Sequence, residues 1–197
     1  MKLVFASNNA HKLDEVRAIM PSGVKVLSLK DVGFEHDIEE NGTTLDENSR
    51  IKAETVCRWL INANQWEQLD GVFADDTGLE IDALNGAPGV FTARWAGSPA
   101  ANRQKALASL AGQTNRACQF RTVITLLTPK EETLQVEGVV RGKIATEEHG
   151  EGGFGYDPIF IPEGYEKTFG ELPATIKNSI SHRARALTKL IQSYEFA

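Results

Sequence analysis

Residues 118–127 and 134–144 are two long segments in which apolar and polar side chains alternate, and this pattern limits the fold more than any other in the chain. A period of two is typical of strands with one buried face. The segment TPKEE between them carries the residues of a turn, so the two strands are predicted to pair as a hairpin. The chain must therefore build part of its core on a β-sheet.

Helical periodicity separates the other predicted strands. An apolar run at residues 3–6 predicts a buried strand, and the spacing of Leu13, Val16 and Met20 predicts a helix that ends at Pro21. Further strands are predicted at 24–29, 71–75 and 79–84, and further helices at 101–110 and about 179–194. A long helix is predicted after Thr43 or Thr44, with a buried face formed by Ala53, Val56, Cys57, Leu60 and Ile61. This order predicts an α/β protein with a mixed sheet and flanking helices.

Composition excludes several classes of protein. A chain of 197 residues with 41% hydrophobic residues can bury a sizeable core, as one domain or two joined lobes. The net charge of -6 argues against a general binder of nucleic-acid polymers or membrane surfaces, since both need a basic face. Cys57 and Cys118 lie far apart, so neither a disulfide framework nor a zinc site is predicted, and a cytoplasmic location fits. The first apolar run is too short for a signal peptide, and no segment is predicted to span a membrane.

The segment SNNAHK, residues 7–12, is a polar turn between a predicted strand and a predicted helix. A helix N-terminus offers unpaired N–H groups and partial positive charge to an anion, and Lys12 would add a full charge. The alternative is a helix capped by Ser7 or Asn8, with Lys12 in water. Spacing alone favours neither reading.

Two acidic pairs point to a metal ion. Magnesium takes one or two carboxylates together with water and substrate phosphates. Glu39-Glu40 lies in a predicted loop, where adjacent acids are usually just hydrated. Asp75-Asp76 interrupts an apolar strand, so burial of these acids would require a compensating partner.

A third cluster contains cations near the start of the last predicted helix, at Lys177, His182 and Arg183. Cations at a helix N-terminus oppose the helix dipole, which indicates an external partner. The alternative is that His182 caps the helix or packs, and that Arg183 pairs with an acid.

These segments, together with FADDTGLEIDALNGAPGVFTARWAG, GEGGFGYDPIF and ISHRARAL, resemble the inosine/xanthosine triphosphate pyrophosphatase family over nearly the whole chain. The resemblance implies a single domain over residues 1–197, with two lobes around a central nucleotide-binding cleft. It implies Mg²⁺-dependent hydrolysis of noncanonical purine triphosphates, namely ITP, dITP and XTP, to the monophosphate and pyrophosphate. It also implies a homodimer that cleans the cytoplasmic nucleotide pool.

The same resemblance assigns roles to individual residues. Asp76 matches the catalytic carboxylate and, with Glu39, binds the metal, while Thr77 touches substrate. Phe154 is expected to stack on the base. The remaining substrate contacts that the resemblance implies are Ser7, Asn8, Asn9, Ala10, His11 and Lys12 for the triphosphate, and Gly155, Tyr156, Asp157, Lys177, His182 and Arg183 for the base and sugar side.

Two rival functions stay open. A Maf-like pyrophosphatase would act on modified pyrimidine triphosphates, but the His182-Arg183 pair and GGFGYDP favour a purine. A non-catalytic nucleotide-binding sensor would use the same phosphate and base contacts, but would not need Glu39 and Asp76 together.

Overall fold

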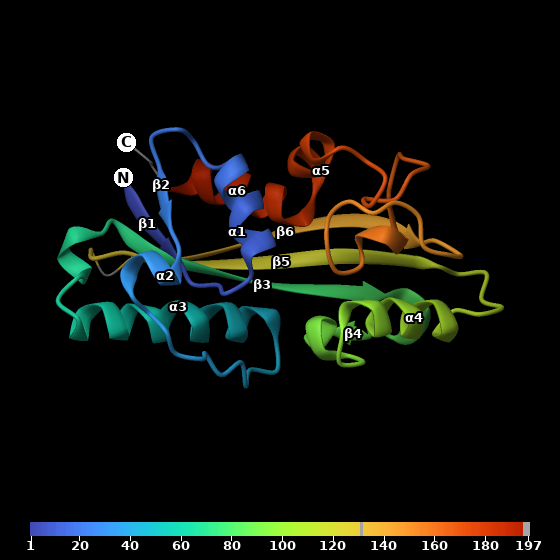
Figure 1. The fold of residues 1–197 in the computed structure, drawn as a ribbon, viewed down its shortest axis with the longest axis horizontal. Helices are drawn as coiled ribbons and strands as arrows, with labels where there is room; N and C mark the ends of the chain where they lie inside the picture. The colour runs from blue at the N-terminus through green and yellow to red at the C-terminus, as the bar shows by residue number, and fades with distance from the viewer. Residues whose placement is uncertain (131, 195–197) are drawn as a thin grey trace. The chain divides into compact units, whose positions relative to one another are not determined.

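A computed structural model describes residues 1–130 and 132–194 and confirms a mixed α/β fold (Figure 1). The helices are α1 (Ala10–Ile19), α2 (Leu29–Val32), α3 (Leu45–Asn62), α4 (Pro99–Ser109), α5 (Ala174–Ile180) and α6 (His182–Ser193). The strands are β1 (Lys2–Phe5), β2 (Lys25–Leu27), β3 (Gly71–Ile81), β4 (Pro88–Gly89), β5 (Ala117–Leu127), β6 (Thr133–Ile144) and β7 (Phe160–Pro162). Short 3₁₀ turns lie at Trp66–Gln68, Asp82–Leu84, Thr92–Arg94 and Asp157–Ile159.

The described strands form one mixed sheet in the order β2-β1-β3-β5-β6-β7, and β4 pairs with β3. Strand β1 is parallel to both β2 and β3, whereas the β3–β4 and β6–β7 pairs are antiparallel. The chain divides into two compact units. Among the described residues, unit 1 comprises 1–76, 122–130, 132–138 and 183–194, and unit 2 comprises 77–121 and 139–182.

Unit 1 is a sheet covered on both faces. Alternation along β1 sends Leu3 and Phe5 to one face, where they pack with residues of α1 and α6, and sends Val4 to the other, where it packs with α2 and α3. Figure 1 shows α1 and α6 on one side of these strands and α3 on the other. Burial on both faces explains why the sequence of β1 is a continuous apolar run.

Unit 2 has its own core, built from the second half of β3, from α4 and from the outer parts of β5 and β6. Aromatic residues fill its centre, and Phe160 packs against Phe120 at 4.7 Å and Phe169 at 5.3 Å between ring centroids. The buried Tyr156 hydroxyl donates to the Thr92 carbonyl at 2.8 Å, and burial raises the pKa of this hydroxyl. The glycine-rich segment after residue 150 leads into β7, as predicted.

The two strands predicted at 71–75 and 79–84 are one continuous strand, β3, so the predicted DDTG turn is wrong. The acids Asp75 and Asp76 do not break the strand, because each carboxylate meets cationic side chains inside the protein. Those cations come from segments distant in sequence, so local pattern did not show that they pair with these two acids.

Other boundaries differ for local reasons. Ser28 and Asp31 form a capping box that starts α2 where a longer strand was expected. The last helix is interrupted by Ser181, whose extended backbone separates α5 from α6, so Lys177 lies on α5. Ile61 is 50% exposed and lies outside the buried face of α3, while Thr44 caps this helix as predicted.

Candidate functional site

The SNNAHK segment forms the connection from β1 to α1. Asn9, rather than Ser7 or Asn8, is the N-cap, since its side-chain oxygen accepts from the Lys12 N–H at 3.2 Å. The Asn9 N–H in turn donates to the Ser7 hydroxyl at 3.2 Å. Residues 8–11 are exposed at the N-terminus of a ten-residue helix, where backbone N–H groups suit an anion.

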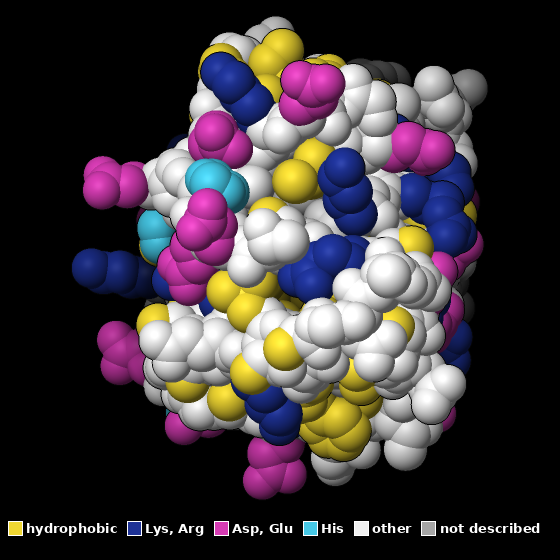
Figure 2. Space-filling view, turned by 90° about the vertical axis from the view of Figure 1, so that its right-hand side faces the viewer, with side chains coloured by type: hydrophobic (Ala, Val, Ile, Leu, Met, Phe, Trp, Pro, Cys, Tyr) yellow, Lys and Arg dark blue, Asp and Glu magenta, His cyan; other side chains and the backbone are white. Residues whose placement is uncertain are grey.

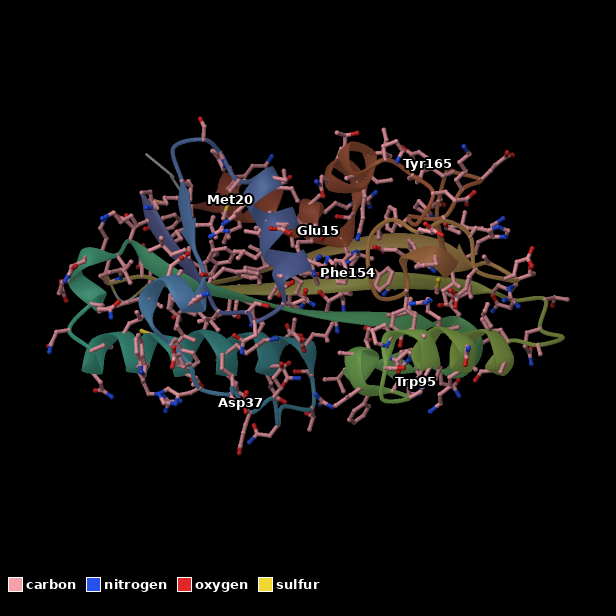
Figure 3. All side chains as sticks on the ribbon, viewed as in Figure 1. Glu15, Met20, Asp37, Trp95, Phe154 and Tyr165 are labelled. Carbon is pink, nitrogen blue, oxygen red and sulfur yellow. The ribbon has the colours of Figure 1, made fainter. Side chains whose placement is uncertain are left out.

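Lys12 extends from the first turn of this helix to the buried middle of β3. Its ammonium donates to Asp75 Oδ1 at 2.9 Å, and Arg183 Nε donates to Asp75 Oδ2, also at 2.9 Å. The Arg183 guanidinium also pairs with Glu15 of α1, which Figure 3 labels. Arg183 therefore joins the start of α6 to both α1 and β3 within unit 1.

The electrostatics of Asp75 follow from these partners. Burial alone would raise the pKa of the Asp75 carboxyl, but Lys12, Arg183 and Lys52 outweigh burial and hold this pKa well below its usual range. Burial lowers the pKa of the Lys12 ammonium, although Asp75 opposes that shift. Asp75 is therefore an anion that keeps two cations in place.

Asp76 has a different environment. Lys52 of α3 donates to Asp76 Oδ1 at 3.3 Å and to Glu40 Oε2 at 3.1 Å. Asp76 Oδ2 is buried and has no hydrogen-bond partner among the described residues. Burial raises the pKa of Asp76, and the nearby Lys52 and Lys12 offset only part of this shift. A buried carboxylate oxygen without a donor is suited to accept a cation or a proton.

The two acids of the pair at residues 39 and 40 lie in different surroundings. Glu40 forms an ion pair with Lys52, which also bonds Asp76, whereas the Glu39 side chain is exposed. We call Lys12, Glu15, Glu40, Lys52, Asp75, Asp76 and Arg183 the Asp75–Asp76 cluster. Among residues 1–130 and 132–194, no three His, Cys, Asp or Glu side chains are grouped to hold a metal ion. A metal here would have at most two protein carboxylates, the number that Mg²⁺ commonly uses when phosphates complete its shell.

The loop that carries Glu40 is fixed to α3. The side-chain oxygen of Asn48 accepts from the Gly42 N–H at 2.9 Å, and Glu47 accepts from the Thr43 N–H at 2.6 Å. A Cβ at Gly42 would lie 2.7 Å from the Asn48 oxygen, so glycine is needed for this approach. Helix α3 therefore positions Glu40 through its first turns and holds it through Lys52.

A second cluster lies in unit 2, around Phe154, which Figure 3 labels. The Lys177 ammonium lies 4.6 Å from the centre of the Phe154 ring and donates to Asp157 Oδ2 at 2.5 Å. Asp157 also accepts from the Phe154 N–H at 2.7 Å. We call these three residues the Phe154 cluster. Phe154 is only half-buried, and an aromatic ring of this kind can stack on a flat partner.

The other residues predicted in unit 2 lie in different surroundings. His182 is buried and stacks on Phe120 with ring centroids 4.6 Å apart. Tyr156 belongs to the core, while Thr77 and Gly155 are half-buried. The Gly155 carbonyl accepts from Arg103 of α4 at 2.9 Å. His182 and Arg183 are adjacent in sequence but belong to different units.

A glycine substitution tests how tightly the Phe154 loop is built. Gly153 has φ +70°, and a Cβ there would lie 2.0 Å from Asp157 Oδ2, whereas Gly164, with φ +83°, has open space. Gly164→Ala should cost roughly 1–2 kcal/mol of unfolding free energy from backbone strain alone. Gly153→Ala should cost about 1–3 kcal/mol more because it displaces Asp157. Urea denaturation of both variants measures this difference, and equal losses would show that the loop yields freely.

Sequence reasoning missed two members of the Asp75–Asp76 cluster, namely Glu15 and Lys52, and named Glu40 only as one of an acidic pair. Lys52 left a signal, because it falls on the buried face of α3 in register with Asn48, Val56 and Leu60. Lysine is almost never buried unless paired, so a lysine at such a position indicates an anionic partner. Glu15 and Glu40 show no comparable local pattern.

Charged side chains of both signs lie on the surface (Figure 2). Figure 2 shows one face of the molecule, where basic side chains are interspersed with acidic and apolar ones. No helix within residues 1–130 and 132–194 has the length and apolar character needed to cross a membrane. Cys57 and Cys118 are free thiols.

Comparison with known proteins places the chain in one group. The model of the Ham1 family matches residues 3–193. A dITP/XTP pyrophosphatase of Flavobacterium johnsoniae is 45% identical over 97% of this chain and 96% of its own, and one of Bacillus subtilis is 45% identical over 98% and 96%. The solved structure of the Staphylococcus aureus Ham1 protein superposes with a TM-score of 0.84 at 39% identity, covering 98% of this chain and 97% of that one. The resemblance seen in the sequence is thereby confirmed.

Proposed function

Since this chain belongs to the Ham1 family, we propose that it hydrolyses noncanonical purine nucleoside triphosphates, namely dITP, ITP and XTP, to the monophosphate and pyrophosphate. One structural observation supports this reaction most strongly. Asp76 presents a buried carboxylate oxygen without a donor, beside the cations Lys12 and Lys52. Positioned cations and a carboxylate are the parts that phosphoryl chemistry needs. All of residues 1–197 would act as one catalytic domain.

Magnesium fits the Asp75–Asp76 cluster. We propose that Asp76 holds it together with one acid of the pair at 39–40. The family resemblance assigns Glu39, whereas Glu40 is the acid that shares the Lys52 ammonium with Asp76. A bound Mg²⁺ would neutralise charge on the phosphate oxygens. The orphaned Asp76 Oδ2 is the atom that supports this assignment.

The N-terminus of α1 would bind the triphosphate. Ser7 to Lys12 would place the N-terminus of α1 and the Lys12 ammonium at the phosphates, while the N–H groups of Asn9 and Lys12 bond within the turn and keep it closed. Water would attack the α-phosphorus, the bond to the bridging oxygen would break, and pyrophosphate would leave. The proton of the attacking water would pass to Asp76, whose pKa burial raises.

The Phe154 cluster would bind the base. The half-buried Phe154 ring offers a stacking surface, and Lys177 and Asp157 fix the loop that carries it. We assign recognition of the 6-keto oxygen to His182 and Arg183, as donors that adenine, which carries a 6-amino group, would leave unpaired. Thr77, Gly155 and Tyr156 complete the substrate contacts that we propose.

Phe154→Ala should mainly weaken substrate binding. Stacking of a base on an aromatic side chain is worth about 1–3 kcal/mol, so KM for dITP should rise roughly 5-fold to 150-fold with little change in kcat. Steady-state kinetics measure both constants. Phe91→Ala, which removes an aromatic ring that is 55% exposed, is the matched control. An unchanged KM would assign Phe154 a packing role instead.

The function is tested by incubating the protein with dITP and Mg²⁺, with ATP and GTP in parallel, and separating pyrophosphate from orthophosphate. We expect pyrophosphate, released selectively from dITP. Orthophosphate would mean cleavage of the terminal phosphate and would refute the assigned bond. No turnover of any purine would favour the Maf-like activity on modified pyrimidines, or, if dITP binds tightly without turnover, the sensor.

We also propose that the protein is a cytoplasmic homodimer, as the family resemblance implies. Two free thiols are consistent with a reducing compartment. Light scattering at micromolar concentration should give twice the chain mass of 21.6 kDa. A mass of one chain would refute the dimer.

A further inference from the structure

The Lys52 ammonium lies where two carboxylates of unit 1 converge. It is 3.1 Å from Glu40 Oε2 and 3.3 Å from Asp76 Oδ1, and the Lys52 residue is 6% exposed. Helix α3 fixes its origin, since Asn48 and Ser49, one turn earlier on the same face, are fully buried. The protein therefore carries its own cation between two of its acids.

We propose that Lys52 is a resident cation that competes with the divalent metal for Glu40 and Asp76, so that the protein binds a free divalent cation weakly until phosphate groups engage the ammonium. This inference rests on the proposed function, because it takes these two carboxylates as the metal ligands. It adds a dependence of metal binding on phosphate binding.

The position of the Lys52 ammonium explains why it would compete with a metal ion. A metal ion bound to Glu40 and Asp76, through Asp76 Oδ2 or Oδ1, would share both carboxylates with an ammonium that lies within hydrogen-bond distance of Glu40 Oε2 and Asp76 Oδ1. The ammonium and the metal repel each other, and buried charges are poorly screened by salt. One ammonium also leaves Asp76 Oδ2 without a donor, so the site is only partly satisfied by Lys52. The carboxylates are thus kept together but remain able to accept a better cation.

Coupling of this kind is reciprocal. If phosphate binding draws the ammonium away from the carboxylates, the metal binds more tightly, and by linkage a bound metal favours phosphate binding. The protein would then select the metal–triphosphate complex over free metal. The opposite possibility is that Lys52 only holds Glu40 and Asp76 together, in which case removing its charge would weaken metal binding.

The test measures Mn²⁺ affinity without nucleotide, by electron paramagnetic resonance, in the wild type, Lys52→Met and Lys52→Gln. Lys30→Met, at an exposed lysine of α2, is the control for loss of one positive charge. We expect Mn²⁺ to bind both Lys52 variants roughly 10-fold or more tightly than the wild type, within the usual range of coupling between sites. The control should bind as the wild type does. Unchanged or weaker binding in the Lys52 variants would overturn the inference.

The experiment also tests the inference if a Lys52 variant does not fold. The Gln variant keeps a donor for the carboxylates, so it covers the case in which Met is not tolerated. A Lys52 variant that folds only with Mn²⁺ supports the inference, because the metal then replaces the ammonium. Variants that stay unfolded with Mn²⁺ show that the ammonium is structural and overturn it. Hydrolysis of dITP by the wild type is measured in a separate assay. A protein that does not hydrolyse dITP refutes the proposed function but leaves the Mn²⁺ comparison valid. Unchanged Mn²⁺ affinity in the Lys52 variants refutes the inference but leaves the proposed function intact.

Discussion

Asp76→Asn should lower kcat for dITP by roughly 100-fold or more, while the protein stays folded. Asparagine keeps the size of the side chain but removes both the charge that would hold a metal and the basic oxygen that would take a proton. The buried Asp76 Oδ2 has no donor among the described residues, so no existing hydrogen bond to that oxygen is lost. Steady-state kinetics with dITP and Mg²⁺ measure the effect.

The matched control is Asp82→Asn, at an exposed carboxylate that lies 3.7 Å from Arg141 in unit 2. It removes one negative charge from the chain and should leave kcat within about 2-fold of the wild type, since surface ion pairs contribute little. Thermal melting of both variants checks the fold. Near-normal turnover by folded Asp76→Asn would remove this residue from the chemistry.

The elements that sequence predicted well are those whose hydrophobic period belongs to a single segment. Strands β5 and β6 and helices α1 and α3 lie within a few residues of their predicted bounds, because each segment carries its own apolar face. Strand β3 was divided in two because paired aspartates are rare in a buried strand. Its continuity depends on Lys12 and Arg183, which lie 63 and 108 residues from Asp75 in the sequence.

The candidate site was also predicted only where local sequence pattern marks its residues. Motifs such as SNNAHK and SHR indicated Lys12, His182 and Arg183, because unusual residues occur together at an element boundary. Lys52 was missed because a lysine on a helix is ordinary until its burial is known. Local pattern does not distinguish Glu39 from Glu40, since both are acids in one loop, and the family resemblance assigned the metal to Glu39. Only the fold shows which carboxylate lies within reach of Lys52.

The ion pairs of Asp75 make it the residue of the site on which stability depends most. Its side chain is 1% exposed and bonds Lys12 and Arg183, and the Arg183 side chain is also 1% exposed. Removing one partner of a buried pair leaves the other charge without compensation, which costs far more than the pair itself contributes. Asparagine retains only one acceptor oxygen for two cations.

Asp75→Asn should therefore lower the free energy of unfolding by about 3–5 kcal/mol, measured by urea denaturation, against about 0–1 kcal/mol for the exposed Asp82→Asn. The pH dependence follows from the depressed pKa of Asp75 in the folded protein. A carboxyl of this kind stabilises the fold fully above its unfolded pKa of about 3.9, and loses that contribution as the pH falls toward the folded pKa. The difference between wild type and variant should thus stay constant from about pH 5 to 8 and shrink below about pH 4. A loss under about 1 kcal/mol at neutral pH would mean that water solvates Lys12 and Arg183 in place of the carboxylate, and that the cluster is less buried than its geometry indicates.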